Sequence, residues 1–497
     1  MEEPRRTGTV YLIGAGPGDA GLITVKGLEC LKQVQHVIYE TNVSESVLSL
    51  LPLQVRAEAF SMRDVTAHEA AEQIVAKLCK QAAKGQSVAF LGSGDSFFYG
   101  ASALIAQQLE RRKVPYQVVP GVSSVIGTAE YSGVPLVHED YTTAVHIFAA
   151  TKEGKAVDLP FDAIAKLDGT LVFHMAWGRM QEISDGLIHA GVNPMLPATY
   201  ISDGTTADQR QVRGTVRTIA EDVKKSKMDE GGELIVGYVC ALSDQMNWRK
   251  RLPLHGKRIF LVSAREENNP VTVQLRNLGA QVISFSTVSS RMRKVNRESA
   301  EIFKHIQEYQ YLLFTSNYGV HSFFAQFVEL GLDVRRLADV KICAAGRASQ
   351  VALQEHGLQV DYMPNTYGVE ALGEMIGKLA SDQERILAAR ASNSGRTLYQ
   401  AIRRGTKAYF NELSVYAHQY VQPDWIVHLP EYQNPKAKMH VVFMSGAAVQ
   451  GFVKCFPGHQ MQSVTAYCRG SQTEAIAKRY GMDRSEERRV GKECRSR

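Results

Sequence analysis

The sequence has no long apolar run, so it offers no candidate for a membrane-spanning helix. A helix that crosses a bilayer needs about 20 consecutive apolar residues, whereas the best apolar stretches, such as Val88 to Leu91, are only as long as a strand. The first ten residues, MEEPRRTGTV, also lack the apolar centre of a secretory signal peptide. We therefore expect a cytoplasmic protein that does not enter the membrane.

Cysteines are few and scattered. The sequence has 7 of them, with no CxxC pair and no histidine nearby at the spacing of zinc ligands. Such cysteines are typical of reduced structural thiols. We expect neither a disulfide framework nor a metal site.

The charge balance is mild, and no long basic run is present. A net charge of +6 over 497 residues, without a basic stripe and interleaved aromatic residues, argues against a nucleic-acid partner. A few well-placed arginines could still bind a small polyanionic substrate. Residues 484–497 are highly charged, with Val490 as their single aliphatic residue. They could bind an acidic partner, but we interpret them as a non-native or disordered tail.

What the sequence does have is the composition of a folded α/β protein of more than one domain. Hydrophobic residues make up 44% and charged residues 22%, and a single core rarely grows beyond about 300 residues. Segments typical of strands and helices alternate throughout. A polar stretch at 243–256 separates two such series. We expect one domain over 8–250 and a second over 256–483.

The clearest elements are short apolar strands and amphipathic helices. The expected helices are Ile23–Lys32, His68–Lys84 and Val271–Leu278. The expected strands are Thr9–Ile13, Val34–Tyr39, Ser87–Leu91, Val145–Ala149, Thr170–His174, Ala198–Ile201, Glu233–Val239, Arg258–Ser263 and Ala280–Phe285.

Three glycine-rich loops follow strands in the first half. They are Gly14-Ala-Gly-Pro-Gly-Asp19, Gly92–Gly100 and Val118–Ser124. The first departs from the dinucleotide-binding pattern GxGxxG, because Asp19 stands at the third glycine and proline removes an amide donor. One such loop is as compatible with a tight turn as with a ligand site. Three loops at the carboxyl ends of strands predict a ligand cleft.

The first half resembles the tetrapyrrole methyltransferases, in particular uroporphyrinogen-III C-methyltransferase. The resemblance rests on segments that occur in order over about residues 8–248: VYLIGAGPGDAGLITVKGLECL, GDSFFYG, VVPGVSSVIGTAEYSGVPLVHEDY, GTLVFHMAWGRMQEI and DGTTADQRQVRGTV. It implies two α/β lobes with S-adenosylmethionine bound between them, and methyl transfer to a pyrrole carbon without a metal.

The resemblance also assigns cofactor-binding positions. Met175 would pack near the adenosine, although a core methionine after a strand is the alternative, and the second loop would meet the amino-acid end of the cofactor. The full expected set is Pro17, Gly92, Gly94, Asp95, Ser123, Ser124, Met175, Gly204, Thr205 and Thr206.

Several positions depart from the family pattern around the expected substrate. Glu40 stands where the family commonly has an aspartate, and it keeps a carboxylate that could act as a base. Met62 stands where a lysine assigned to proton transfer is expected, and Glu139 replaces an arginine. We retain Glu40 and Arg63 as catalytic candidates, with an ordinary surface arginine as the alternative for Arg63.

The second half resembles uroporphyrinogen-III synthase, whose fold has two α/β lobes and a chain that crosses between them twice. The matching segments include LLFTSNYGVHSFF, ILAARASNSGRTL, LSVYAHQY and VVFMSGAAVQGF. Tyr416 matches a tyrosine that can assist loss of the substrate hydroxyl, and a packed strand tyrosine is the alternative. The expected contacts to substrate carboxylates are Thr315, Ser316, Arg390, Ser445 and Ser471.

Together the two resemblances imply a bifunctional enzyme that closes hydroxymethylbilane to uroporphyrinogen III and methylates this product to precorrin-2, the entry to sirohaem and cobalamin. A methyltransferase dimer is also implied. Two alternatives remain: a first half that methylates another substrate, as a corrin-ring methyltransferase or diphthine synthase does, and a first half that has lost turnover and only binds tetrapyrrole.

Overall fold

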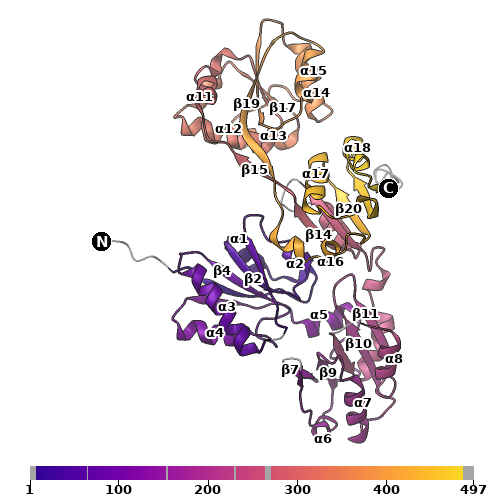
Figure 1. Ribbon diagram of the computed structural model, residues 1–497. Coiled ribbons are helices and arrows are strands. Elements are labelled where there is room, and N and C mark those ends of the chain that lie inside the picture. Colours follow the sequence, from indigo (N-terminus) through magenta and orange to yellow (C-terminus); the bar gives the residue numbers. More distant parts are fainter. Residues whose placement is uncertain (1–6, 64, 153–154, 229–230, 264–269, 485–497) are drawn as a thin grey trace. The chain divides into compact units, whose positions relative to one another are not determined.

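A computed structural model describes residues 7–63, 65–152, 155–228, 231–263 and 270–484. The chain divides into two compact units, one formed by Met1–Thr287 with Val421–Arg497 and the other by Val288–Tyr420. Four five-stranded sheets, two in each half of the sequence, carry the architecture (Figure 1). The expected α/β fold class, with two lobes in each half, is confirmed. None of the described helices is long and apolar enough to cross a membrane.

The first sheet is wholly parallel, with strand order β3-β2-β4-β1-β5. Its strands are short, and the inner strands β2 and β4 are buried at every residue. The bounds are β1 Val10–Gly14, β2 His36–Glu40, β3 Arg56–Phe60, β4 Val88–Gly92 and β5 Tyr116–Val119. A parallel sheet puts all five carboxyl ends, and the loops that follow them, at one edge.

Helices cover both faces of this sheet, because successive strand residues point to opposite sides. Leu12, Ile38 and Phe90 belong to the cluster with α3 and α4, whereas Ile13 and Leu91 belong to the cluster with α1 and α2 (Figure 1). A reciprocal capping box fixes the start of α3. The bounds are α1 Val25–Gln33, α2 Glu45–Leu48, α3 Ala67–Ala82 and α4 Ser102–Arg111.

The second sheet is mixed, with order β11-β10-β12-β9-β6, and only β6 and β9 run parallel. Its strands are β6 Val145–Ala149, β9 Thr170–His174, β10 Pro197–Ser202, β11 Arg210–Thr215 and β12 Glu233–Val236, with a separate hairpin of β7 Thr151–Lys152 and β8 Lys155–Ala156. The accompanying helices are α5 Ser124–Tyr131, α6 Phe161–Ile164, α7 Met180–His189, α8 Ile219–Lys225 and α9 Ser243–Met246.

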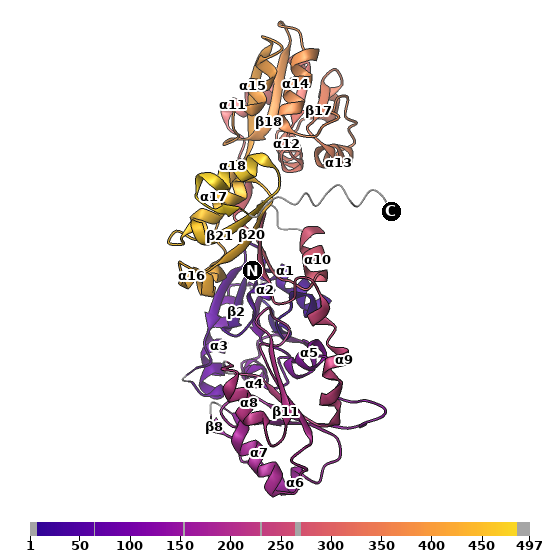
Figure 2. The same ribbon diagram turned by 90° about the vertical axis from the view of Figure 1, so that its right-hand side faces the viewer.

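The third sheet, in the same unit, is parallel and drawn from two distant parts of the chain, in the order β14-β13-β20-β21-β22. Helices α17 and α18 cover one face and α10 the other (Figure 2). The strands are β13 Arg258–Ser263, β14 Gln281–Ser286, β20 Met439–Phe443, β21 Val464–Cys468 and β22 Asp483–Arg484. The helices are α10 Pro270–Asn277, α16 Pro430–Gln433, α17 Gly446–Cys455 and α18 Ser471–Arg479.

The second unit holds the fourth sheet, in the order β15-β19-β18-β16-β17, with only the β15–β19 pair antiparallel. Helices α11, α12 and α13 pack on one face, and α14 and α15 on the other (Figure 1). The strands are β15 Val288–Met292, β16 Tyr311–Phe314, β17 Lys341–Ala344, β18 Arg385–Ala391 and β19 Tyr409–Tyr420. The helices are α11 Arg297–Lys304, α12 Asn317–Glu329, α13 Arg347–Glu355, α14 Val369–Leu379 and α15 Thr397–Arg403.

Within the first unit, one hydrophobic cluster contains residues of both the first and the third sheet, including Leu91 and Phe285. An ion-pair group lies at the same contact. The Arg258 guanidinium is 3.1 Å from Glu45 and 3.0 Å from Glu431, and only 17% of this arginine side chain is exposed. The two halves of the sequence therefore share a core in this unit.

Candidate functional site

The glycine-rich loops after β1, β4 and β5 are joined by backbone contacts. Gly16 and Gly94 exchange hydrogen bonds, with N–O distances of 3.0 and 2.9 Å. A Cβ added to Gly121 would stand 2.4 Å from the carbonyl oxygen of Gly94. No side chain fits there, so the close approach itself requires glycine. The three loops thus meet at one edge of the first sheet, as the sequence predicts.

Asp95 ties the second of these loops to the third. Its Oδ1 accepts a hydrogen bond from the Phe97 amide, and its Oδ2 accepts one from the Gly121 amide, both at 2.9 Å. A carboxylate that receives two backbone amides holds its loop rigidly. Asp95 is a predicted cofactor residue, and in this structure it also fixes the shape of the loops around it.

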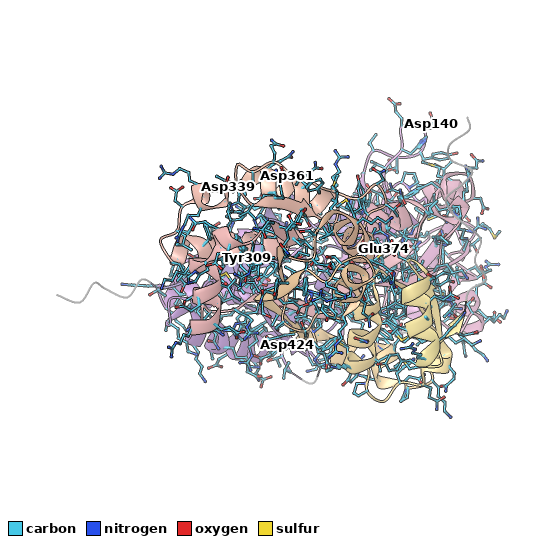
Figure 3. All side chains as sticks on the ribbon, turned by 90° about the horizontal axis from the view of Figure 1, so that it is seen from above. Asp140, Tyr309, Asp339, Asp361, Glu374 and Asp424 are labelled. Carbon is cyan, nitrogen blue, oxygen red and sulfur yellow. The ribbon has the colours of Figure 1, made fainter. Side chains whose placement is uncertain are left out.

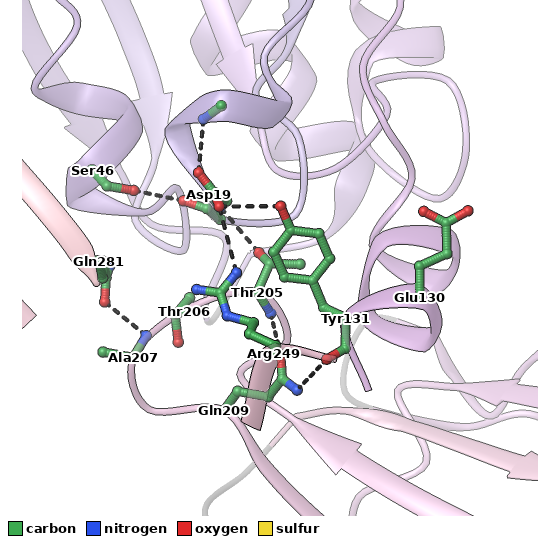
Figure 4. Close-up of polar contacts among 12 residues, drawn as sticks. Asp19, Ser46, Glu130, Tyr131, Thr205, Thr206, Ala207, Gln209, Arg249 and Gln281 are labelled. Atoms are coloured by element: carbon green, nitrogen blue, oxygen red, sulfur yellow. Dashed lines mark hydrogen bonds and ion pairs between the residues drawn. The ribbon is translucent and has the colours of Figure 1, made fainter. Parts of the chain in front are cut away.

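The loop after β10 lies against the first glycine-rich loop (Figure 4). The Asp19 amide donates to Oγ1 of Thr205 at 3.0 Å, and the Thr205 amide donates to Gln209 at 2.8 Å. Thr205 is 1% exposed and has φ +69, a conformation that non-glycine residues adopt only when their surroundings impose it. Gly204 packs against Thr128, and Thr206 bonds within its own loop. Predicted residues from both lobes are therefore adjacent.

Pro17 lies beside α5, where a Cβ on Gly127 would stand 2.6 Å from the proline ring. Ser123 is the residue before α5, and its side chain makes no capping hydrogen bond. Ser124 begins the helix, and its Oγ is 3.4 Å from Oε1 of Glu233. Pro17 and the two serines thus border the place where α5 meets the first loop and the second sheet.

Arg249 is a residue of this region that the sequence analysis missed. It comes from the polar stretch expected to be a domain linker, yet it is 4% exposed. Its guanidinium lies 4.5 Å from the centre of the Tyr131 ring and 3.5 Å from Asp19 (Figure 4). The Tyr131 hydroxyl also donates to Asp19, at 3.1 Å, and burial together with this carboxylate raises the pKa of Tyr131 to about 12. Only the cluster of basic residues beside Trp248 could have signalled such a role.

Gln281, on β14 of the third sheet, reaches the same loops. Its Oε1 accepts from the Ala207 amide at 2.9 Å (Figure 4), and its Nε2 donates to Ser44 Oγ at 3.3 Å. The neighbouring Ser46 donates to the carbonyl of Gly18 at 2.6 Å. A residue of the second half of the sequence therefore supports two loops of the first.

The two catalytic candidates of the first half occupy different surroundings. Glu40 is buried behind Gly92, where its Oε2 accepts from the Ser93 amide at 3.0 Å, and burial raises the pKa of this carboxyl. Arg63 is exposed, and its backbone amide donates to Ser61 Oγ. Met62 packs against the hydrophobic cluster of α3 and α4. The structure does not bring Glu40 and Arg63 into contact.

Met175 follows β9 with φ +56, and 48% of its surface is exposed. The exposure disfavours the alternative of a core methionine. The exposed side chains of Phe97, Phe98 and Tyr99, from the second glycine-rich loop, add further apolar surface. The Tyr99 ring stacks on His174, next to Met175, with ring centres 5.0 Å apart. Exposed apolar side chains of this kind mark a candidate binding surface.

Beyond α5, the departure at Glu139 lies in an exposed turn. His138 and Thr142 exchange backbone hydrogen bonds across it. The Asp140 side chain, 84% exposed, lies at the surface (Figure 3), with its Oδ2 3.8 Å from Nδ1 of His138. Glu139 is exposed as well.

In the second unit, Tyr416 and Ser316 form the clearest pair. Their hydroxyl oxygens are 2.9 Å apart, and Tyr416 is 4% exposed. Ser316 caps α12 by accepting from the Gly319 amide at 3.0 Å, and Thr315 precedes it with its side chain half-buried. Burial lowers the pKa of His418, whose ring meets that of Tyr416 edge to face. The structure therefore places the predicted tyrosine beside the predicted residue Ser316.

Arg390 lies in β18 and is 4% exposed. It pairs with Glu412 at 3.0 Å and donates to the Gly395 carbonyl at 2.9 Å, so its guanidinium is engaged within the unit. Ser445 and Ser471 belong to the first unit, where Ser445 caps α17 and Ser471 is the exposed first residue of α18. The tail expected at 484–497 lies, apart from Arg484, outside the described residues.

Comparisons with known proteins agree with this organisation. Residues 9–220 match the family model of the Tetrapyrrole (Corrin/Porphyrin) Methylases, and residues 270–491 match that of Uroporphyrinogen-III synthase HemD. The chain is 29% identical, over 96% of its length and 94% of the relative's, to the Porphyrin biosynthesis protein HemD of Ruminiclostridium josui. It is 28% identical to the Uroporphyrinogen-III C-methyltransferase of Bacillus subtilis, over 71% of this chain and 73% of that one.

Among solved structures, the Uroporphyrin III C-methyl transferase of Thermus thermophilus is 30% identical, covers 47% of this chain and 99% of its own, and gives a TM-score of 0.41. The two family matches follow one another along the sequence and together span most of it. The chain therefore joins a domain of the tetrapyrrole methylase family to a domain of the uroporphyrinogen-III synthase family.

Proposed function

We propose that this chain closes hydroxymethylbilane to uroporphyrinogen III and then methylates that product twice, with S-adenosylmethionine as methyl donor, to give precorrin-2. The observation that carries the proposal is the meeting of three glycine-rich loops at one edge of the first sheet. The family matches add the order of the chemistry, since the product of the second half is the substrate of the first.

The residues present fit S-adenosylmethionine. The glycine-rich loops expose backbone at the carboxyl ends of β1 and β4, Met175 offers an exposed apolar side chain, and the buried Glu233 keeps a carboxylate oxygen that no described group bonds. When bound, the cofactor supplies an electrophilic methyl group on a sulfonium. We propose that the predicted set from Pro17 to Thr206 holds it and that the rigid loops align it with the pyrrole carbon.

Removal of the pyrrole proton needs a base. Glu40 is our proposed candidate, and Arg63 is proposed to pair with a substrate carboxylate. The burial of Glu40 and the packing of Met62 favour a second candidate function, in which the methylase half binds tetrapyrrole but turns it over slowly.

In the synthase half, we propose that Tyr416 donates a proton to the departing hydroxyl of hydroxymethylbilane, with Ser316 fixing the direction of its hydroxyl. Thr315, Ser316, Arg390, Ser445 and Ser471 are proposed to contact the substrate carboxylates. Since Arg390 is paired with Glu412, it would have to share its guanidinium with the substrate.

We also propose the domain limits, the oligomeric state and the cellular location of the enzyme. We propose domain limits of 8–250 and 256–483, a homodimer, and no nucleic-acid partner. A cytoplasmic location is supported by the six described cysteines, all of which carry free thiols.

A coupled assay tests the proposal. Hydroxymethylbilane and S-adenosylmethionine are supplied together without oxygen, and products are identified by mass and absorbance. We expect a doubly methylated type-III product. Accumulation of unmethylated uroporphyrinogen III would retain the synthase and reject the methylation step, whereas a type-I ring would reject the synthase.

A further inference from the structure

Glu233 is a buried carboxylate whose two oxygens differ in their hydrogen bonds to the described residues. It begins β12, in the middle of the second sheet, and is 3% exposed. Its Oε1 is 2.7 Å from Nδ1 of His174 and 3.4 Å from Oγ of Ser124. Its Oε2 is buried and, among the described residues, has no hydrogen-bond partner. A buried oxygen without a hydrogen bond raises the free energy of the folded protein. A ligand that donates a hydrogen bond to this oxygen would therefore bind more tightly.

The surroundings of Glu233 belong to the proposed cofactor site. His174 directly precedes Met175, and a Cβ on Gly94 would stand 3.2 Å from the Ser124 amide. Tyr99 extends from the second glycine-rich loop with φ +59 and stacks on the His174 ring. The carboxylate therefore lies where two glycine-rich loops meet the segment around Met175.

The chemistry of the free oxygen narrows what it can bind. An ionised carboxylate only accepts hydrogen bonds, so its partner must be a donor. The adenosine of S-adenosylmethionine offers two kinds, the ribose hydroxyls and the 6-amino group of adenine. The methionyl ammonium is also a donor, but we expect the amino-acid end of the cofactor at the second glycine-rich loop and the adenosine beside Met175. The methionyl carboxylate is excluded from this position, because two like charges would meet away from water.

We propose that Oε2 of Glu233 recognises the adenosine of the cofactor by accepting a hydrogen bond from a ribose hydroxyl or from the 6-amino group. This inference rests on the proposed function, since it assumes that the site takes S-adenosylmethionine. His174 is the positioning residue, because its Nδ1 holds the other carboxylate oxygen and Tyr99 fixes its ring.

Binding to the full chain, measured by calorimetry, tests the inference without depending on turnover. The probes are S-adenosylhomocysteine and three analogues of it. One analogue has a 6-oxo base, one lacks the ribose 2′-hydroxyl and one lacks the 3′-hydroxyl. Glu233→Gln removes the charge and replaces one carboxylate oxygen by an NH2 group, which donates hydrogen bonds and does not accept them. Glu233→Asp keeps the charge but shortens the side chain by one methylene. Glu221→Gln, at a position of α8 whose side chain is 69% exposed, is the matched control.

We expect Glu233→Gln to weaken S-adenosylhomocysteine binding by about 10-fold or more, as the loss of a charged hydrogen bond implies, with Glu221→Gln unchanged. The analogue that lacks the donor bonded by Glu233 should bind the wild type and Glu233→Gln almost equally. The identity of that analogue shows whether Glu233 bonds the ribose or the base. Glu233→Asp should fall between the two proteins and guards against misfolding of the glutamine variant.

Two outcomes overturn the inference separately from the proposed function. If wild-type protein binds S-adenosylhomocysteine and Glu233→Gln binds it equally well, Glu233 plays no part. If the variant weakens all four probes by one common factor, Glu233 bonds none of the tested adenosine donors and the inference fails. Absence of binding to the wild type would instead reject the proposed function, and this inference with it.

Discussion

The candidate sites of the methylase and the synthase are built differently. All ten predicted cofactor residues lie in one compact unit, where backbone amides and the Asp95 carboxylate join their loops directly. The synthase candidates are divided, with Ser445 and Ser471 in the first unit and the rest in the second. Two of their hydroxyls, those of Ser316 and Ser445, also serve as helix caps. The methylase candidates are thus joined by direct contacts within one unit, whereas the synthase candidates offer the Tyr416–Ser316 hydrogen bond within the second unit.

The largest effect should follow from breaking the packed loops. Gly121→Ala would put a methyl group 2.4 Å from the Gly94 carbonyl oxygen, and the loops would have to separate. We expect S-adenosylhomocysteine to bind about 100-fold more weakly, because even a small misplacement of a preorganised site is costly. Calorimetry measures this binding. Gly458→Ala, where a Cβ meets nothing within 4 Å, should change nothing. Unaltered binding by Gly121→Ala would show that the loops are softer than their contacts suggest.

The corresponding change in the synthase removes one hydroxyl. Tyr416→Phe should lower the rate of ring closure by about 30-fold, between the value of one hydrogen bond and that of a general acid. The rate is measured from hydroxymethylbilane, with methylation of supplied uroporphyrinogen III followed in parallel. That second reaction should not change. Tyr409→Phe, on the same strand but 66% exposed, is the control. An equal loss in both variants would contradict a special role for Tyr416.

A smaller effect concerns stability at Glu40. Burial raises the pKa of this carboxyl in the folded protein, so the folded state holds the proton more tightly than the unfolded chain does. Stability from this group is therefore present below the unfolded pKa, about 4.5, and is lost as pH rises toward the folded pKa. Glu40→Gln should be more stable at pH 7 by about 1 kcal/mol and nearly equal to wild type at pH 4. Thermal unfolding across pH checks this, and a variant that is less stable at pH 7 would contradict it.

The smallest effect should come from Met62→Lys, which restores the lysine that the family pattern places here. The methionine packs against the cluster of α3 and α4, so we expect a loss of about 1 kcal/mol in stability and no gain in methylation rate. Initial rates with supplied uroporphyrinogen III measure the outcome. A large increase in rate would show that the methylase half had lost its proton-transfer group and nothing else.

Much of the fold was predictable because short apolar runs, and the glycines at which strands and helices end, are local features of the sequence. Val145–Ala149, Thr170–His174 and Arg258–Ser263 form strands with the bounds that the sequence predicts. Glu233–Val239 was predicted as one strand, but the strand ends at Val236 and a 3-10 helix follows, because Gly237 has φ +155. Helix limits differ by one or two residues, since caps such as Thr24 set them.

The polar contacts of the site were less predictable. The pairing of His174 with Glu233 joins residues 59 positions apart, and that of Arg249 with Asp19 spans 230. Neither belongs to a spaced motif, so only the folded arrangement reveals them. The meeting of the three loops was predictable, because parallel strands bring their carboxyl ends to one edge whatever else the sequence does.

The hydrophobic cluster shared by the first and third sheets bears on how the two activities can be separated. Ile13, Leu31 and Leu91 on one side and Phe285 and Trp425 on the other are buried in a single core. A fragment ending before Lys257 would expose the first set to water and lose the Gln281 support of its loops. Cutting the polypeptide in its polar stretch at 243–256 should therefore give a first half that aggregates. Co-expression of the two pieces should be needed to obtain a folded methylase, whatever the exact position of the cut.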